Sequence, residues 1–393
     1  MQFETQSTID VARDEFAEYV TITLDRDFRS TSFATIAAEA RQRGLFTARE
    51  MTQCQRGSAL PDWLLERITK VAPPALSKAW TRHTIDEPFG AGSHPVDLFE
   101  AGPARLSIHN HNRLALVADG IVPAMSPPEG RWTAPWVAAA TDVPALPGTT
   151  MNAVVEGGPL YSHWIFDALP KLLALRRHMD LDAVDNFLFT SLRNPFHAET
   201  LALLGIDPAR CHTREHHGAV VDVERVLWVP RQRRAGLARP ELYDAVRDLF
   251  RPETLDPATP RRVYVSRGRA SRRRLVNEEE LLPIIAARGY TVVNFEDYGI
   301  AGAAGLLHQA EHIIGLHGAG FANIVFAPHS CRVTELHGPH ISAEFHRIAE
   351  TFGLPYEAYD CGYDRAAYGG DSLGMSHADV VVSKEAFAGL LLP

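Results

Sequence analysis

Cysteine is scarce and scattered in this chain of 393 residues. The four cysteines, Cys54, Cys211, Cys331 and Cys361, form no Cys-x-x-Cys pair, so we expect reduced thiols of a cytosolic protein rather than a disulfide framework. The first residues lack a basic segment followed by an apolar core, and no stretch approaches the roughly 18 uncharged apolar residues that span a bilayer. We therefore expect no signal peptide and at most peripheral membrane contact.

An excess of positive charge is also missing. The chain has 39 Lys and Arg against 48 Asp and Glu, and this net charge of −9 argues against general nucleic-acid binding. Local charge differs, because seven arginines fall within residues 261–274 and three more lie at positions 231, 233 and 234. Such a cluster indicates an anionic small ligand or membrane surface, unless it is simply a solvated charged face.

The length and the ordinary composition, with 46 % hydrophobic residues, predict a globular protein of two domains with additions. Residues 1–95 read as a helical N-terminal extension, with helices near 33–43 and 64–71. We expect a first domain over residues 96–250, a second over 251–375 and a tail over 376–393. The proline-rich segment 252–261 reads as the linker between the two domains.

The first domain has strands and helices in mixed order. We expect a hairpin of strands 105–108 and 113–118, a loop over 121–149, and strands at 152–156, 187–190 and 220–229. Helices are expected at 161–178 and 195–204. Pro170 lies inside the first of these helices and should kink or divide it.

The second domain alternates regularly. Strands are expected at 262–266, 290–295, 312–316 and 332–336, and helices from Asn277 to about 289, then at 300–311, 321–327 and 342–352. Asn277 should cap its helix, with Glu280 completing a capping box. This alternation predicts an α/β fold with a parallel sheet, whose carboxyl strand ends share one rim where ligands bind.

The turn at 317–320, His-Gly-Ala-Gly, is the most informative feature of that rim. A strand that meets a helix through glycines brings backbone N–H groups and a helix N-terminus to one point, which suits an anion. Arg267 follows another strand end and could pair with a phosphate. Glu335, at a third strand end, could accept from the two hydroxyls of a ribose, or form an ion pair. Asn323 could bind a ligand or cap locally.

Several segments together resemble glycosyltransferase family 61, of the type that builds bacterial capsular and surface polysaccharides. They are Arg-Arg-Val-Tyr-Val-Ser-Arg at 261–267, Arg-Arg-Arg-Leu-Val-Asn-Glu-Glu-Glu at 272–280, the run from 310 to 323, Val-Thr-Glu-Leu at 333–336, and a His-Trp, Asp and Leu-Pro segment at 158–172. The chain departs from the pattern with Phe-Ala-Asn at 321–323 and with Gly-Ile-Ala-Gly-Ala-Ala from residue 299.

The resemblance implies a glycosyltransferase B architecture, with two Rossmann-like domains facing across a cleft. It implies inverting hexosyl or pentosyl transfer from a nucleotide sugar, usually a uridine diphosphate (UDP) sugar, to a glycan acceptor, without an essential metal or cofactor. Arg267 and the glycine turn would hold the diphosphate and Glu335 the ribose. The expected donor-binding residues are Arg267, Asn277, His317, Gly318, Ala319, Gly320, Asn323 and Glu335.

Inverting transfer needs a base for the acceptor hydroxyl and positive charge for the leaving diphosphate. His163 and Asp167 are four residues apart on one expected helix, so one of them could be the base, supported by the other, or they could form a structural network. His317 is the competing catalytic residue, because it adjoins the phosphate seat and could assist the leaving group.

Three other readings remain. The histidine pairs at 109 and 111 and at 216 and 217 lack a third metal ligand at recognisable spacing, so we expect no metal site. A nucleotide-dependent dehydrogenase is disfavoured, because the glycine turn lies between the third and fourth strands of its domain rather than in the first turn. A non-catalytic sugar- or nucleotide-binding protein on a decayed transferase fold stays open. We expect the protein in the cytoplasm of a bacterium.

Overall fold

The computed structural model describes residues 78–85, 96–108, 113–118, 120–122, 137–138, 140–155, 157–217, 220–230, 240–254, 256–340, 342, 344–363 and 377–393. The helices expected at 33–43 and 64–71 and the histidines at 109 and 111 lie outside these residues. Within the part of the chain that is described, no helix is both long and apolar enough to cross a membrane.

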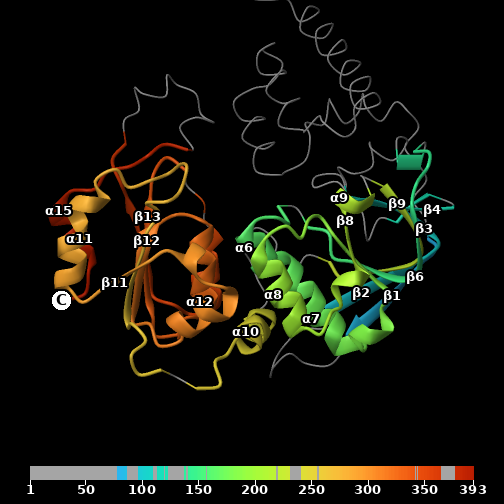
Figure 1. The fold of residues 1–393 in the computed structure, drawn as a ribbon, viewed down its shortest axis with the longest axis horizontal. Coiled ribbons are helices and arrows are strands. Elements are labelled where there is room, and N and C mark those ends of the chain that lie inside the picture. The colour runs from blue at the N-terminus through green and yellow to red at the C-terminus, as the bar shows by residue number, and fades with distance from the viewer. Residues whose placement is uncertain are drawn as a thin grey trace, which may run out of the picture.

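The described residues form two lobes, each built on its own sheet (Figure 1). The N-terminal lobe holds nine strands: β1 (Trp80–Ile85), β2 (Val96–Ala101), β3 (Ala104–Ile108), β4 (Arg113–Val117), β5 (Gly120–Ile121), β6 (Ala145–Asn152), β7 (Asn186–Phe189), β8 (Cys211–Thr213) and β9 (Val220–Trp228). Their order is β5-β4-β3-β9-β6-β7-β8, with β2 also on β9 and β1 on β2. Strand β1 therefore joins this sheet, although the sequence assigns its residues to a helical extension.

The N-terminal sheet is mixed rather than purely parallel. Strands β9, β6, β7 and β8 run parallel, whereas β3, β4 and β5 and the β1–β2 pair add antiparallel edges. The expected hairpin is confirmed, since Arg105 pairs with Leu116. The expected loop over 121–149 is wrong at its end, because β6 begins at Ala145. A register shift between Leu146 and Thr149 accommodates the intervening Pro147 and Gly148.

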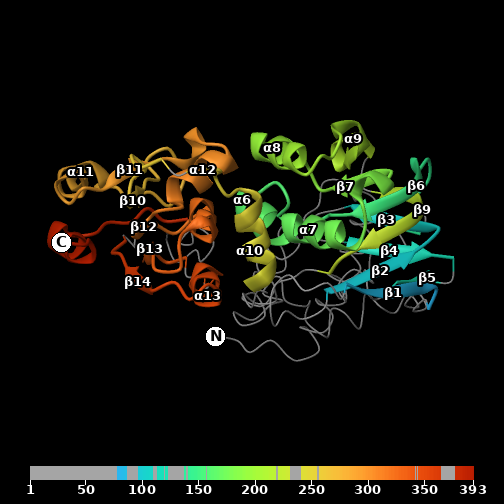
Figure 2. The ribbon, with the colours of Figure 1, turned by 90° about the horizontal axis from the view of Figure 1, so that it is seen from below.

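The helices of this lobe are α6 (Tyr161–His163), the π-helical turn η3 (Trp164–Ala168), α7 (Leu169–His178), α8 (Pro195–Leu203), α9 (Arg214–His217) and α10 (Pro240–Leu249), with short 3-10 turns at Leu181–Ala183 and Pro208–Arg210. Of these, α6, α7, α8 and α10 lie between the sheet and the other lobe, whereas α9 adjoins β8 and β9 (Figure 2). Pro170 divides the expected long helix as predicted: a π turn precedes it, and it stands in the first turn of α7, where its missing N–H costs no hydrogen bond.

The C-terminal lobe contains a five-stranded parallel sheet in the order β11-β10-β12-β13-β14. Its elements are β10 (Arg262–Val265), α11 (Glu278–Ala287), β11 (Thr291–Val293), the 3-10 turn η6 (Phe295–Asp297), α12 (Ile300–Leu307), β12 (His312–Leu316), the 3-10 helix η7 (Ala319–Phe326), β13 (Arg332–His337), α13 (Glu344–Thr351), β14 (Tyr356–Asp360) and α15 (Lys384–Leu390). The predicted parallel alternation is confirmed, and β14 and α15 extend it.

The two faces of this sheet bury different side chains. On β12, Ile314 packs with α11 and α15, whereas Ile313 packs toward α12 and η7. The chain steps from β10 to β11 on one side and then crosses to β12 on the other. The carboxyl ends of β10 and β12 are therefore the topological switch point, where open α/β sheets form a crevice.

Helices from both lobes pack together between the two sheets (Figure 2). One continuous apolar cluster includes Trp164 and Tyr243 of the N-terminal lobe and Phe321 of the C-terminal lobe. Hydrogen bonds add to it: the Arg247 Nε–H donates to the Val325 carbonyl over 2.9 Å. The helix α6 packs against η7 and so brings the N-terminal lobe to the glycine turn that precedes η7.

Candidate active site

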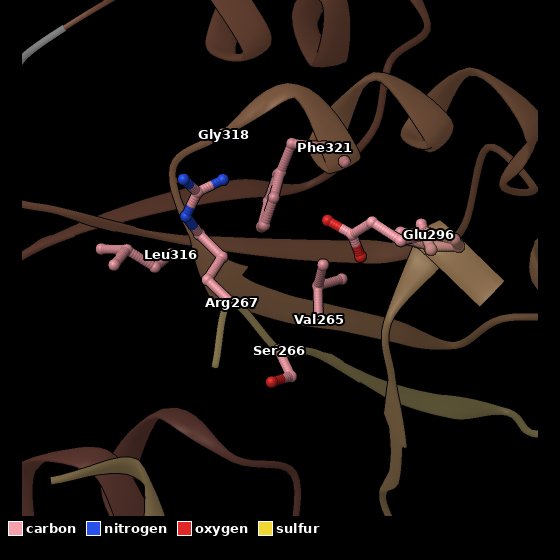
Figure 3. Close-up of a pocket in the computed structure, with 9 residues that line it drawn as sticks. Val265, Ser266, Arg267, Glu296, Leu316, Gly318 and Phe321 are labelled. Carbon is pink, nitrogen blue, oxygen red and sulfur yellow. The ribbon is translucent and has the colours of Figure 1, made fainter. Parts of the chain in front are cut away.

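A small pocket lies at the switch point. It is lined at the ends of β10, β11 and β12 by Val265, Ser266, Arg267, Phe295, Glu296, Leu316, Gly318, Gly320 and Phe321, seven of which are labelled in Figure 3. The rim predicted from strand order is thus a concave site.

Arg267 lies where β10 ends, and its guanidinium points toward the turn at Gly318 (Figure 3). Its Nε–H donates to the Arg273 carbonyl over 3.0 Å and its Nη2–H to the Arg272 carbonyl over 3.1 Å. A Cβ atom on Gly318 would collide with Nη1 of Arg267, so glycine is needed for this approach. Burial lowers the pKa of Arg267, partly opposed by Glu296. The structure therefore brings the predicted arginine and the predicted glycine turn together.

The turn itself keeps donors available for a ligand. The His317 N–H donates to the Leu336 carbonyl over 2.8 Å, and the Phe321 N–H closes the first turn of η7 onto the Gly318 carbonyl over 2.9 Å. The N–H groups of Gly318, Ala319 and Gly320 lie between these two and have no acceptor within that turn. The segment from Ala319 is a 3-10 helix that begins earlier than the helix expected from residue 321.

The His317 side chain forms a hydrogen bond with the buried Glu335 carboxylate. Nδ1 of His317 lies 2.5 Å from Oε1 of Glu335, and the Tyr356 hydroxyl donates to Oε2 over 2.5 Å. His337 Nε2 lies 3.5 Å from the same oxygen. Glu335 has 0 % of its surface exposed, so both carboxylate oxygens are occupied inside the protein. The expected ribose contact is therefore not supported by this geometry, because His317 stands between Glu335 and the rim.

The charges of this network favour an ionised carboxylate. Burial alone would raise the pKa of Glu335, but the hydrogen bonds and charges of His317 and His337 outweigh it and lower the pKa to about 2. Burial would lower the pKa of His337, whereas its hydrogen bond to the Glu335 carboxylate raises the pKa above its ordinary value. The carboxylate thus fixes the His317 ring through Nδ1. Within the described residues, Nε2 of His317 has no hydrogen-bond partner.

The same three side chains could be read as metal ligands. One ligand atom each of His317, Glu335 and His337 lies within 4.8 Å of the others. Two ligands of a tetrahedral zinc ion stand roughly 3.3 Å apart, whereas His317 Nδ1 and Glu335 Oε1 are separated by only 2.5 Å. The geometry fits a hydrogen-bonded network better than a metal site.

Two asparagines expected to bind the donor have protein partners instead. Asn277 precedes α11 as predicted, but its side chain makes no cap: Nδ2 donates to the Val382 carbonyl over 2.7 Å, so the capping box with Glu280 is wrong. Asn323 is buried, and its Oδ1 accepts from the Tyr161 hydroxyl over 2.6 Å while its Nδ2 donates to the Gly320 carbonyl. It joins the two lobes and braces the turn.

His163 and Asp167 form the predicted pair. Nδ1 of His163 lies 2.8 Å from Oδ2 of Asp167, across the start of the π turn. Asp167 is 1 % exposed, whereas the His163 side chain is 23 % exposed, so the imidazole is the group that a substrate could reach. Gly157, with φ of +67°, lies against the imidazole ring and leaves no room for a Cβ. Such π turns recur at functional sites.

Glu296 is a pocket residue that the sequence did not single out. It follows β11, and its carboxylate points into the pocket opposite Arg267 (Figure 3). The signal was available, because an acidic residue at the end of the second strand is where dinucleotide-binding folds contact a ribose.

The comparisons with known proteins agree with the motifs. Residues 161–334 match the family model described as glycosyltransferase 61. No curated protein matches the chain significantly. The matched region begins at Tyr161 in α6 and ends at Thr334 in β13, so it includes the His163–Asp167 pair, Arg267 and the glycine turn. The resemblance seen in the sequence is confirmed over residues 161–334, which match the glycosyltransferase family 61 model.

Proposed function

We propose that the protein is an inverting glycosyltransferase that moves a sugar from a nucleotide sugar, in the first instance a UDP-sugar, to an oligosaccharide or glycan acceptor without an essential metal. The observation that carries this proposal is the pocket at the β10–β12 switch point, where Arg267 and the N–H groups of Gly318, Ala319 and Gly320 converge. That arrangement suits a diphosphate. The pocket lies within the region that matches the transferase family.

Charge on the leaving diphosphate needs stabilisation in the transition state. Arg267 supplies a fixed guanidinium there, since two carbonyls already hold it in place. The ring of His317 is fixed by Glu335, so Nε2 can donate to a phosphate oxygen when the ring is protonated. Arg267 and His317 together would supply the positive charge that a divalent cation supplies in many transferases.

For the acceptor hydroxyl we propose His163 as the base and Asp167 as the residue that positions it. The buried Asp167 carboxylate accepts from Nδ1, which leaves Nε2 as the basic atom of the neutral ring. The α6 helix that carries His163 packs against η7, next to the donor pocket. A glycosyltransferase B arrangement, with donor and acceptor between the lobes, is consistent with this approach of α6 to the pocket.

For the ribose we propose Glu296 in place of Glu335. Its carboxylate faces the pocket and, among the described residues, has no hydrogen bond or ion pair. A comparison of UDP with 2′-deoxy-UDP tests this contact. Wild-type protein should prefer UDP, and Glu296→Ala should lose the preference; an unchanged preference would remove Glu296 from the donor site.

The central experiment is a panel of nucleotide sugars screened by thermal stability, because a ligand at 100 times its dissociation constant adds about 2.7 kcal/mol. Each donor that binds is then assayed for hydrolysis and for transfer to glycan acceptors. Near-normal turnover in both His163→Ala and Asp167→Asn would refute the assigned base. Binding without any turnover would favour the alternative, a non-catalytic nucleotide-sugar-binding protein on a transferase fold.

We place the reaction in the synthesis of a bacterial surface or capsular polysaccharide, in the cytoplasm with peripheral contact at the inner membrane. The family resemblance and the arginine cluster near the donor pocket support this setting. Fractionation of expressing cells tests it, and recovery of the protein from the periplasm would contradict it.

A further inference from the structure

Three consecutive arginines, Arg272, Arg273 and Arg274, follow β10 on the loop beside the donor pocket. The backbone of this loop is fixed. The guanidinium of Arg267 binds the carbonyls of Arg272 and Arg273, and the Arg273 N–H donates to the His377 carbonyl over 3.2 Å. The loop is therefore preorganised by the same arginine that lines the pocket.

The three side chains have different surroundings. Arg274 forms an ion pair with Asp379, with Nη2 and Oδ2 2.7 Å apart. Nη1 of Arg272 lies 2.8 Å from Nε2 of His377. Arg273 has no hydrogen bond or ion pair from its guanidinium to any described residue, and its Nε atom is buried without a partner. An unsatisfied buried donor of this kind costs roughly 1–3 kcal/mol, so it calls for an explanation.

The backbone at Arg273 is also strained. Its φ is +54°, in the left-handed region that a long side chain rarely adopts and that costs roughly 1–2 kcal/mol. Glycine would adopt this conformation without that penalty. The strained backbone and the buried donor without a partner among the described residues both lower the stability of the folded protein. Such backbone outliers cluster at ligand sites.

Arg273 lies near two other positively charged side chains, Arg267 and Arg272. Burial and the charges of Arg267 and Arg272 together lower the pKa of Arg273 to about 10, and Glu335 is the opposing charge. Glu335 is already committed to His317 and Tyr356, so it offers no direct partner. An anion placed between Arg267 and Arg273 would neutralise both guanidiniums.

We propose that Arg273 binds a phosphate of the ligand, together with Arg267, and that it is retained at a strained position for this contact. The identity of the anion as the diphosphate of a nucleotide sugar rests on the proposed function. The Nε and Nη donors of Arg273 have no partner among the described residues, and a guanidinium with such donors can contact two phosphate oxygens at once. Arg273 is thus a binding residue of the donor site and does not serve to stabilise the fold.

Arg273→Gly separates binding from structure, because it removes the guanidinium and relieves the strained φ at the same time. We expect its thermal stability to equal or exceed that of the wild type, while affinity for UDP and for inorganic pyrophosphate falls about 10- to 100-fold in calorimetric titrations. Arg274→Gln is the matched control, since it removes the same charge one residue away and should change affinity less than about 3-fold. Arg273→Asn, which also tolerates positive φ, repeats the test if the glycine variant folds poorly.

Unchanged affinity in Arg273→Gly, or an equal loss in Arg274→Gln, would overturn the inference. A loss of stability in both Arg273 variants would also overturn it, because the residue would then serve the framework. Failure of wild-type protein to bind UDP or pyrophosphate refutes the phosphate contact itself. The transfer assay tests the proposed function separately. If the wild-type protein transfers sugar and Arg273→Gly binds UDP with unchanged affinity, the role of Arg273 is refuted and the proposed function stands.

Discussion

Replacement of Glu335 by Gln tests the network that positions His317. The substitution keeps the size of the side chain but removes the negative charge that accepts from His317 and Tyr356 at 2.5 Å each. An amide has one acceptor oxygen and one donor nitrogen, so it cannot satisfy both neighbours as the carboxylate does. We therefore expect a loss of stability and a misplaced His317 ring.

The magnitude follows from the pKa of Glu335. Its ordinary value is 4.5, and the folded protein lowers it to about 2. Each unit of difference between the folded and unfolded states is worth about 1.4 kcal/mol, so the ionised carboxylate contributes about 3 kcal/mol to the free energy of unfolding at pH 7. Because the folded pKa is the lower one, this contribution is present above about pH 4.5 and is lost as the pH falls toward 2.

Urea unfolding followed by tryptophan fluorescence and circular dichroism measures the loss, and hydrogen exchange of β12 and β13 amides localises it. Glu357→Gln is the control, because Glu357 pairs with Arg332 at the surface of the same sheet and should cost less than about 1 kcal/mol. Equal stability of the two variants at pH 7 would refute the reasoning. So would a gap between Glu335→Gln and wild type that stays constant from pH 5 down to pH 3.

Three further predictions concern the same lobes. His163→Ala should lower kcat about 10²- to 10⁴-fold with folding intact, as measured with the best donor of the panel; a smaller effect would assign the ring a structural role. Gly318→Ala should weaken UDP binding by displacing Arg267, whereas Gly305→Ala, which meets no atom within 4 Å, should stabilise α12 by up to about 1 kcal/mol. Burial lowers the pKa of His312 to about 4, so neutral His312 favours the folded state; stability should be full above about pH 6.5 and fall toward pH 4, with a smaller slope in His312→Gln.

The strands and helices of the C-terminal lobe were predictable because the sequence patterns that mark them are local. Each strand there is a short apolar run bounded by glycine or a polar loop, and β12 was placed at its observed bounds, His312–Leu316. The N-terminal sheet was harder. Strands β2 and β3 pair antiparallel with β9 over sequence separations of more than a hundred residues, as in Arg105 with Asp222, and no local pattern encodes such pairing.

Some site residues could likewise be identified from local sequence signals, whereas others could not. Arg267 and the glycine turn were found because strand order alone brings strand ends to one rim. The sequence left a ribose contact and an ion pair open for Glu335, because it does not reveal that Tyr356, on the unpredicted strand β14, donates a hydrogen bond to the carboxylate. Arg273 was hidden among seven arginines, since only the backbone angle and the partners of each side chain distinguish it from Arg272 and Arg274.

The N-terminus of α12 supports the proposed position of the phosphate at the glycine turn. Two oxygens of Glu199, from the N-terminal lobe, accept from the N–H groups of Ile300 and Ala301 over 2.8 Å each. Gly299 permits this approach, because a Cβ there would press on the carboxylate. The positive end of α12 is therefore already neutralised, and a phosphate placed there would meet a like charge at close range. The unusual glycine-rich start of this helix thus serves the contact between lobes, which agrees with the proposal that the donor binds at the N–H groups beside Arg267.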